Sequence, residues 1–274
     1  RQTDRQTDRQ TDRQTDRQTA KYAPIIGWQG GKRRLAKHIL PMFPPHECYV
    51  ELFAGGAALF FMRDQPAKCE VINDINGELI NLYRVVQNHK DEFVRQFDWS
   101  FASREEFKRL QVMPPQCLTD IQRAARFYYL QRNAFGSKVT GQSFGTAATS
   151  ASKFKTAAIA ESLRLAKERL SGVFIENESW DKVVQRYDRE HTFFYADPPY
   201  WQTTGYGVDF GWEQYEALAK TMRNCKGKMM LSINDHPDIR NLFQDFRITR
   251  FDLAYSISRD KTQKNSGELV ICNW

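Results

Sequence analysis

The sequence predicts an α/β protein with a mainly parallel sheet, a C-terminal β-hairpin and a mainly helical insertion. Before residue 98 and after residue 171, short apolar runs alternate with helical patterns, which is typical of β-α units. Between these positions the alternation stops and helical patterns dominate. The last two apolar runs have no helix between them, so we expect a hairpin. We therefore predict a core domain of residues 21–97 and 172–274, interrupted by an insertion at 98–171.

The first two β-α units lie near the N-terminus. The apolar run 49–53 is followed by two glycines and by a helical pattern over 57–63, so we expect a strand, a tight turn and a helix. A second strand at 70–74 ends in an acidic residue, and a helix follows from Asn76. Two such units in succession predict parallel strands.

The remaining elements follow from the same two patterns. Apolar runs predict strands at residues 172–176, 191–196, 228–233, 247–253 and 268–272. Helical spacing predicts a helix from residue 179 and others at 212–224, 104–110, 119–132 and 156–170. Residues 134–150 are rich in Gly, Ser and Thr, which predicts a long loop or a hairpin.

Residues 1–19 repeat the unit Arg-Gln-Thr-Asp and hold no apolar side chain. Because the segment has nothing to bury, we expect residues 1–20 to form a disordered tail. A four-residue period corresponds to twelve nucleotides, which also accommodates a repeated four-base unit. We hypothesise a slippage-prone tetranucleotide tract and phase-variable expression; the alternative is a harmless low-complexity tail. The sequence starts without Met, so we expect an upstream start codon or a processed N-terminus.

The charge balance favours a polyanionic partner. The chain of 274 residues has 40 Lys and Arg against 33 Asp and Glu, a net charge of +7, and the repeat contributes only five Arg and four Asp to it. Its 41% hydrophobic residues allow a sizeable core. No run approaches the ~20 apolar residues of a membrane span, and no signal peptide is recognisable. The five cysteines are scattered without zinc spacing, so we expect reduced thiols, a cytoplasmic location and no metal.

The sharpest chemical signal is Asp197-Pro198-Pro199-Tyr200, directly after the apolar run 191–196. Ligands of open α/β sheets collect at the carboxyl ends of strands. The prolines remove N–H donors and fix φ, so rigid backbone carbonyls lie beside a carboxylate and a phenol ring. Such a corner matches a planar ring with an exocyclic amino group, which offers two donors and a face to stack. The alternative is a strand end that the prolines merely terminate.

Two weaker motifs precede this corner. Gly55 and Gly56 allow the backbone to approach a ligand closely, and Asp74 at the next strand end is placed to hold a ribose diol. The run from Trp28 to Lys32 contains Gly-Gly-Lys but lacks the strand, the first Gly and the Ser/Thr of a Walker loop, so triphosphate binding is not expected. A core tryptophan and a surface lysine are the alternative for that run.

Four blocks together resemble the Dam-type (D12 class) family of N6-adenine DNA methyltransferases. In the order of that family, they are residues 28–32, 51–56, 73–76 and 195–200. Residues 255–258 and 268–269 are also similar, and the likeness covers most of 22–274. It implies a Rossmann-like methyltransferase sheet with a target-recognition insertion. It also implies methyl transfer from S-adenosyl-L-methionine to N6 of a flipped adenine in double-stranded DNA, as in restriction-modification.

The resemblance also implies roles for individual residues. Cofactor binding is implied for Trp28, Gly30, Gly31, Lys32, Phe53, Ala54, Gly55, Gly56, Asp74, Ile75, Asn177, Glu178 and Asp197. Phe53 to Gly56 would pass under the methionine part of the cofactor, and Asp74 would bind its ribose hydroxyls. Trp28 and Lys32 would close over its amino-acid end. The catalytic corner would consist of Asp197, Pro198, Pro199 and Tyr200.

The chemistry of this corner suits an amino group of low reactivity. Adenine N6 is a poor nucleophile because its lone pair is delocalised into the ring. Hydrogen bonds from N6 to the Asp197 carboxylate and the Pro198 carbonyl would favour a pyramidal nitrogen, and the carboxylate would stabilise the developing positive charge. The base must leave the duplex and stack on Tyr200. No metal and no covalent intermediate are needed.

DNA contacts are expected from the loop after residue 131 and from a C-terminal loop. The candidates are Arg132, Asn133, Phe135, Lys138, Phe144, Arg259 and Lys261. The polar ones would contact base edges or phosphates, and Phe135 or Phe144 would fill the stack that the flipped base leaves. Two positions depart from GATC-methylating members, namely Gly27, often lysine there, and residues 135–137, usually an Asn-Gly-containing run. The recognition sequence therefore stays open.

Two alternatives to this function remain at the level of sequence. The same chemistry would serve cytosine N4, RNA or a protein amide, although Asp197 as the first residue of its motif favours adenine. A catalytically silent DNA-binding regulator is the other, but Lys32, Asp74 and Tyr200 are all intact. A cognate restriction endonuclease is a further candidate partner, and the oligomeric state does not follow from the sequence.

Overall fold

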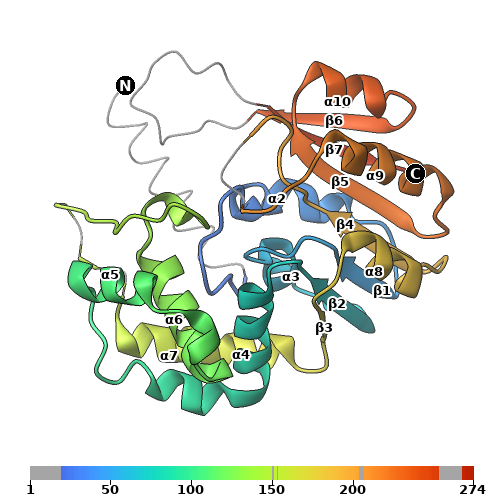
Figure 1. Cartoon of the computed structure of the whole chain (residues 1–274). Coiled ribbons are helices and arrows are strands. Elements are labelled where there is room, and N and C mark those ends of the chain that lie inside the picture. Colours follow the sequence, from blue (N-terminus) through green and yellow to red (C-terminus); the bar gives the residue numbers. More distant parts are fainter. Residues whose placement is uncertain (1–19, 150, 153, 204–206, 253–266) are drawn as a thin grey trace, which may run out of the picture.

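The computed structural model describes residues 20–149, 151–152, 154–203, 207–252 and 267–274. Its centre is a seven-stranded sheet with the order β3-β2-β1-β4-β5-β7-β6 (Figure 1). The strands are β1 (Cys48–Glu51), β2 (Cys69–Asn73), β3 (Phe174–Glu176), β4 (Thr192–Ala196), β5 (Lys228–Asn234), β6 (Arg247–Asp252) and β7 (Gly267–Cys272). β7 is antiparallel to both neighbours, and the other pairs are parallel. This confirms the predicted α/β sheet and its antiparallel C-terminal pair.

The sheet changes direction of progression at β1. The strand β1 pairs with β2 on one side and with β4 on the other, and Glu51 is in register with Ile72 and Tyr195. The carboxyl ends of these three strands therefore meet at one edge. β1 ends at Glu51, two residues before the predicted end: the Leu52 N–H still donates to the Tyr195 carbonyl at 3.0 Å, but the Leu52 carbonyl accepts from the Asn73 side chain at 3.0 Å. A switch point of this kind is where open α/β sheets bind ligands.

Each face of the sheet is covered by its own helices. Alternating side chains of β4 enter two separate cores, with Phe193 and Tyr195 in one and Phe194 and Ala196 in the other. The first core contains residues of α2 (Ala36–Ile39), α3 (Ala58–Met62) and α4 (Gly77–Arg95). The second contains residues of α8 (Trp180–Tyr187), α9 (Trp212–Asn224) and α10 (Pro237–Leu242). The short 3-10 helices η1 (Lys32–Arg34) and η2 (Leu40–Met42) flank α2.

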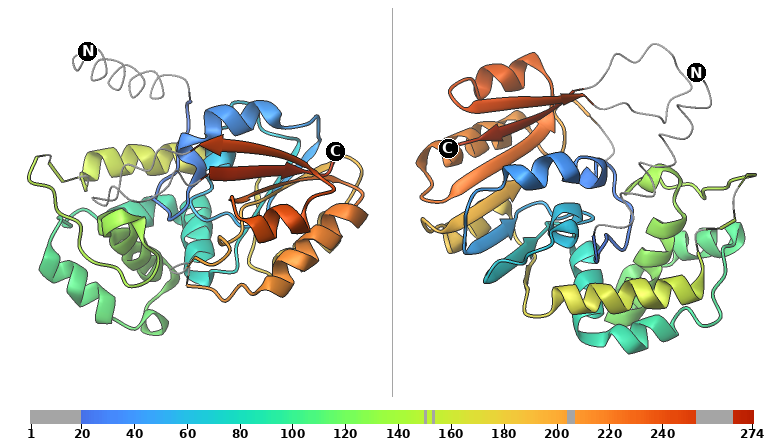
Figure 2. Two further views of the ribbon diagram at one scale, coloured as in Figure 1. Left: turned by 90° about the horizontal axis from the view of Figure 1, so that it is seen from above. Right: turned by 180° about the vertical axis from the view of Figure 1, so that it is seen from behind.

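A helical block stands beside the sheet, as predicted for the middle of the chain. It consists of α5 (Arg104–Val112), η3 (Pro115–Cys117), α6 (Asp120–Asn133), η4 (Phe135–Ser137) and α7 (Thr156–Leu170). Thr119 and Gln122 form a capping box that starts α6. The views in Figure 2 place this block and the strands β6 and β7 on opposite sides of the molecule.

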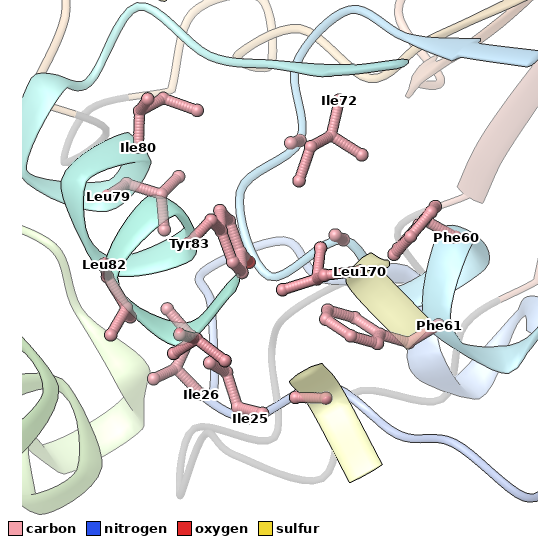
Figure 3. Packing of buried hydrophobic residues seen from close by; sticks show 14 of the residues in the cluster. Ile25, Ile26, Phe60, Phe61, Ile72, Leu79, Ile80, Leu82, Tyr83 and Leu170 are labelled. Atoms are coloured by element: carbon pink, nitrogen blue, oxygen red, sulfur yellow. The ribbon is translucent and has the colours of Figure 1, made fainter. Parts of the chain in front are cut away.

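The helical block is packed onto α4 rather than separated from the sheet. Both α6 and α7 contact α4. Figure 3 shows side chains of α3, α4, α7 and the N-terminal segment pointing toward one another, including Phe61, Tyr83, Leu170 and Ile25. Because one apolar core continues from the sheet into the block, the block has a rigid position relative to the strand ends. The proposed boundaries 98 and 171 stay a prediction.

Within the described residues, no helix is long and apolar enough to cross a membrane, and no group of His, Cys, Asp or Glu could hold a metal ion. The Arg-Gln-Thr-Asp repeat lies outside these residues.

Candidate active site

The turn after β1 brings backbone and an indole ring together. Gly55 has φ +48°, and a Cβ placed on it would lie 2.6 Å from Cδ1 of Trp28. Only glycine tolerates both the left-handed conformation and this contact. The hydroxyl of Tyr83 on α4 donates to the Gly55 carbonyl at 2.6 Å. The glycine turn is therefore held from below by α4 and covered by Trp28.

The end of β2 is tied to this turn by Asp74. Its carboxylate accepts the backbone N–H of Gly55 and of Asn76, each at 2.9 Å. Burial raises the pKa of Asp74, and these two hydrogen bonds oppose the rise. The Asn177 side chain donates to the Asp74 carbonyl at 2.8 Å, which attaches the end of β3 to the same point. Asp74 thus has a fixed position, and its carboxylate, which also accepts the backbone N–H of Ile75, keeps acceptor capacity for a further donor.

The Asp197–Tyr200 segment follows β4 and is fixed by hydroxyl groups. The hydroxyl of Tyr215 on α9 donates to the Pro199 carbonyl, and the hydroxyl of Tyr200 donates to Glu268 on β7. No hydrogen bond of the described part of the chain occupies the Pro198 carbonyl. Pro198 is therefore the motif proline whose carbonyl remains available as an acceptor.

Lys32 lies at the centre of the site although its side chain is only 4% exposed. Its Nζ is 2.7 Å from Oδ1 of Asp197, 3.3 Å from Oε1 of Glu268 and 3.3 Å from the Tyr200 hydroxyl. It also donates to the Gly30 carbonyl at 2.8 Å. Burial opposes the charge of Lys32, but Asp197 and Glu268 outweigh it and hold the lysine pKa well above its usual range. Lys32 is therefore a cation paired with two carboxylates.

Two further carboxyl groups of the site, besides Asp74, have raised pKa values. Burial, helped by the charge of Glu268 and opposed by Lys32, raises the pKa of Asp197 to about 6. Burial, helped by the charge of Asp197, raises the pKa of Glu51 to about 8. Glu51 accepts a hydrogen bond from the Tyr49 hydroxyl at 2.9 Å. At neutral pH Asp197 is mostly an acceptor, whereas Glu51 carries a proton that it can donate.

These groups line one cavity of about 390 Å³ at the switch point, which we call the acidic cavity. All four sequence blocks contribute to it. Of the predicted residues, Trp28, Gly30, Gly31, Lys32, Phe53, Ala54, Gly55, Gly56, Asp74, Ile75, Glu178, Asp197, Pro198, Pro199 and Tyr200 line it. Asn177 does not line it and acts on it through Asp74. Among the described residues, the lining has one basic residue, Lys32, and five acidic ones, Glu51, Asp74, Glu178, Asp197 and Asp209.

Residue roles were missed where they depend on distant strands. Glu51 and Glu268 lie within the sequence blocks that carry the resemblance, but nothing in their spacing indicates that they face the site. Glu268 is 1% exposed and reaches Lys32 because β7 is inserted beside β5. Tyr215 occupies an apolar position of the helical pattern 212–224, which predicts a core residue. Its hydroxyl contact with Pro199 has no sequence signal.

A second hollow of about 790 Å³, which we call the basic groove, adjoins the acidic cavity. Both share the Trp28–Lys32 loop and Tyr200. On its other side the groove is lined by parts of α6 and η4, including Gln131, whose side chain donates to the carbonyls of Gly27 and Ser137 at 2.8 and 2.9 Å. Among the described residues, its lining holds four basic side chains, Lys32, Arg33, Arg34 and Arg132, and no acidic one.

The predicted DNA-contacting residues have different surroundings. Arg132 lines the basic groove and donates to the Ile25 carbonyl at 3.3 Å, while Asn133 donates to the Tyr129 carbonyl at 2.9 Å. Phe135 is 56% exposed and Lys138 is exposed. Phe144, in contrast, packs against Phe107, with ring centroids 5.6 Å apart. Arg259 and Lys261 lie outside the described residues.

The two departures from GATC-methylating members contact each other. A Cβ added to Gly27 would lie 2.1 Å from the Ser137 hydroxyl oxygen. A side chain at residue 27 therefore requires that Ser137 move, so the two positions form one surface of the basic groove.

The fold and this site define an α/β enzyme whose ligand cavity lies at the switch point of the sheet. The model of the D12 class N6 adenine-specific DNA methyltransferase family matches residues 28–257, and the chain belongs to this family. Membership confirms the predicted activity, N6-adenine methylation of DNA, and disfavours the alternatives of cytosine N4 methylation, RNA methylation and a catalytically silent regulator. It also implies a methyl donor of the S-adenosylmethionine type.

Three relatives match over 91% or more of their length. The chain is 28% identical to the Type II methyltransferase M.CviBI of Paramecium bursaria Chlorella virus NC1A, over 92% of this chain and 99% of that protein. It is 29% identical to the Type II methyltransferase M1.LlaDCHI of Lactococcus lactis subsp. cremoris, over 92% and 95%. It is 26% identical to a DNA adenine methylase of Haemophilus influenzae, over 89% and 91%.

Proposed function

We propose that the acidic cavity binds S-adenosyl-L-methionine and that an adenine flipped out of double-stranded DNA is methylated at N6 where this cavity meets the basic groove. One observation carries the proposal. Four sequence blocks between residues 28 and 200 line the same cavity, and the Asp197–Tyr200 corner lies at its junction with the groove. A base stacked on Tyr200 is then in reach of both hollows.

The residues of the acidic cavity fit this cofactor. Its sulfonium and ammonium groups are positive, and five acidic residues surround the cavity. The bare Gly55 backbone leaves room for a chain to pass under Trp28, and Asp74 keeps acceptor capacity for a ribose hydroxyl beside its three backbone hydrogen bonds. Glu178, at the end of β3, is placed for the adenine end. When bound, the cofactor supplies an electrophilic methyl group.

The chain's own groups prepare N6 for transfer. Asp197 and the Pro198 carbonyl accept the two N6 hydrogens, which favours a pyramidal nitrogen with its lone pair directed at the donor. Tyr215 holds the Pro199 carbonyl, which fixes the neighbouring Pro198. Tyr200 supplies the stacking face, and Glu268 fixes the ring through the hydroxyl. As the N6–methyl bond forms and the bond between the methyl group and the donor sulfur breaks, N6 loses one proton, and Asp197, with a pKa of about 6, is a suitable first acceptor.

The test separates binding from transfer. Calorimetry with S-adenosyl-L-methionine should detect binding to the full chain. Incubation with mixed-sequence duplex DNA should yield N6-methyladenine in the digested nucleosides, measured by mass spectrometry. Absence of cofactor binding, or methylcytosine as the product, contradicts the proposal. Gly55→Val provides a cavity control, since its side chain would meet the Trp28 ring and should abolish cofactor binding.

A cognate restriction endonuclease is the proposed biological partner. The support is that two relatives covering almost the full chain are named Type II methyltransferases. DNA from cells expressing this chain should resist cleavage by an endonuclease encoded beside its gene. Full cleavage of such DNA at the methylated sequence contradicts this partnership and leaves the methyl transfer itself unaffected.

A further inference from the structure

The arginines that the structure describes fall into two groups, those with a partner among the described residues and those without. In the helical block, nearly every arginine is engaged by the protein. Arg109 pairs with Glu106, Arg123 with Glu78, Arg164 with Glu161 and Arg169 with Glu70; Arg126 and Arg132 donate to the Leu110 and Ile25 carbonyls; Arg104 lies over the Phe144 ring. The four arginines that pair with a carboxylate add little net attraction for a phosphate, and the other three are held in place by carbonyl groups or a ring.

The exception is the pair Arg33 and Arg34 in η1. Both are exposed, and neither guanidinium forms a hydrogen bond or ion pair with another described residue. Both line the basic groove, which has no acidic residue in its described lining. They are the exposed cations of a hollow that leads to Tyr200.

The short helix η1 holds Arg33 and Arg34 at the surface of the basic groove. In η1 the Leu35 backbone N–H donates to the Lys32 carbonyl at 3.0 Å, which closes a 3-10 turn. With three residues per turn, successive side chains point in different directions, so Lys32 enters the site while Arg33 and Arg34 diverge at its surface. The next residues, Leu35 and Ala36, are buried in the core and anchor the turn.

We infer that Arg33 and Arg34 bind the two DNA phosphates that flank the flipped adenine, so that η1 is a backbone clamp at the entrance to the site. The inference rests on the proposed entry of adenine through the basic groove. A flipped nucleotide must carry its sugar-phosphate backbone to the rim of its pocket. The unpaired charges nearest to Lys32 in the chain are those of this clamp, and phosphate contacts of this kind fix the register of the duplex without reading sequence.

The first test is the salt dependence of DNA affinity. The double variant Arg33→Gln/Arg34→Gln should reduce the slope of log affinity against log salt by about 1.8, since each phosphate contact contributes about 0.9. The probe is a mixed-sequence duplex, titrated at several NaCl concentrations with the full chain. The matched control is Arg109→Gln/Arg164→Gln, which removes two paired arginines and should leave the slope unchanged. Equal effects in both double variants, or an unchanged slope in the first, overturn the inference.

The second test places the clamp next to the target base. Methylation-aware sequencing of DNA from an expressing host identifies the methylated sequence. A duplex with neutral methylphosphonates on both sides of the target adenine should weaken wild-type binding but have no further effect on Arg33→Gln/Arg34→Gln. Additive losses contradict the assignment. In calorimetry, the double variant should bind S-adenosyl-L-methionine with wild-type affinity. If the wild-type protein binds DNA but not this cofactor, the proposed function is refuted, whereas the salt-slope test remains valid.

Discussion

The acidic cavity and the basic groove share one wall but have opposite charge. Five acidic residues surround the first, whereas the described lining of the second has only basic charges. The change of sign occurs over three consecutive residues. Lys32 turns inward and is neutralised by Asp197 and Glu268, while Arg33 and Arg34 turn outward and have no partner among the described residues. The direction of these three side chains therefore separates an acidic surface from a basic one. A cationic donor and a polyanionic substrate can then approach Tyr200 from different sides.

The largest effect is expected on removing the Asp197 carboxylate, which lines the acidic cavity. Asp197→Ala should lower single-turnover methyl transfer by at least about 10²–10³-fold, because the acceptor that stabilises developing charge on N6 is lost. Asp197→Asn is the matched variant, since it keeps the shape and one acceptor oxygen but no charge. Transfer is measured with labelled S-adenosyl-L-methionine, and thermal unfolding checks the fold. Near-wild-type transfer by Asp197→Ala would refute its assigned role.

Tyr200 borders both hollows, so its variants separate stacking from positioning. Tyr200→Ala should weaken binding of the flipped base by about 1–3 kcal/mol, the contribution of one base stacked on an aromatic ring. Tyr200→Phe keeps the ring but loses the hydrogen bond to Glu268, so it should bind better than the alanine variant. The KM for DNA and kcat are the measurements. If Tyr200→Ala leaves both unchanged, the base does not stack there.

The pH dependence of kcat tests the ion pair between Asp197 and Lys32. Asp197 must be ionised to accept hydrogen bonds, and its pKa is about 6, so kcat should be half-maximal near that pH and fall about tenfold per unit below it. Lys32 lowers the pKa of Asp197, so Lys32→Gln should move this acidic limb to higher pH. An unchanged limb in the variant would show that another group controls it.

The sequence predicts what depends on neighbours along the chain. Short apolar runs that end in Asp74 and Asp197 predict strands whose ends meet, and the structure brings both residues to one cavity. The helices 104–112, 120–133 and 156–170 follow from local periodicity and from caps such as Thr119. Local physics is sufficient for these features because each is formed by residues close in sequence.

Features that depend on distant pairing are not visible in the sequence. Glu268 reaches Lys32 only because β7 is inserted between β5 and β6, and Arg169 is neutralised by Glu70, which is 99 residues away in the chain. Composition counts the charges but does not show which are paired. For this reason the sequence places the DNA contacts in the insertion and in the loop with Arg259 and Lys261, and it does not single out Arg33 and Arg34 of η1, which line the basic groove and have no partner among the described residues.

The smallest effect is expected on removing the Tyr215 hydroxyl of α9, which supports the Asp197–Tyr200 segment. Tyr215→Phe keeps the buried ring but loses the hydrogen bond to the Pro199 carbonyl. A hydrogen bond of this kind contributes about 0.5–1.5 kcal/mol, so kcat should fall by up to about tenfold. Cofactor affinity and the salt slope of DNA binding should not change, because Tyr215 lines neither hollow.

A matched control is Tyr187→Phe, which removes a hydroxyl from α8 that donates to Glu176 at 2.8 Å on the same face of the sheet. If Tyr215 positions Pro198 through Pro199, only Tyr215→Phe lowers kcat, while both variants lose similar thermal stability. Equal losses of kcat would mean that the hydroxyl acts on stability alone. In that case Asp197 and Lys32 set the acceptor geometry at N6, and the Tyr215 hydroxyl of α9 does not contribute to it.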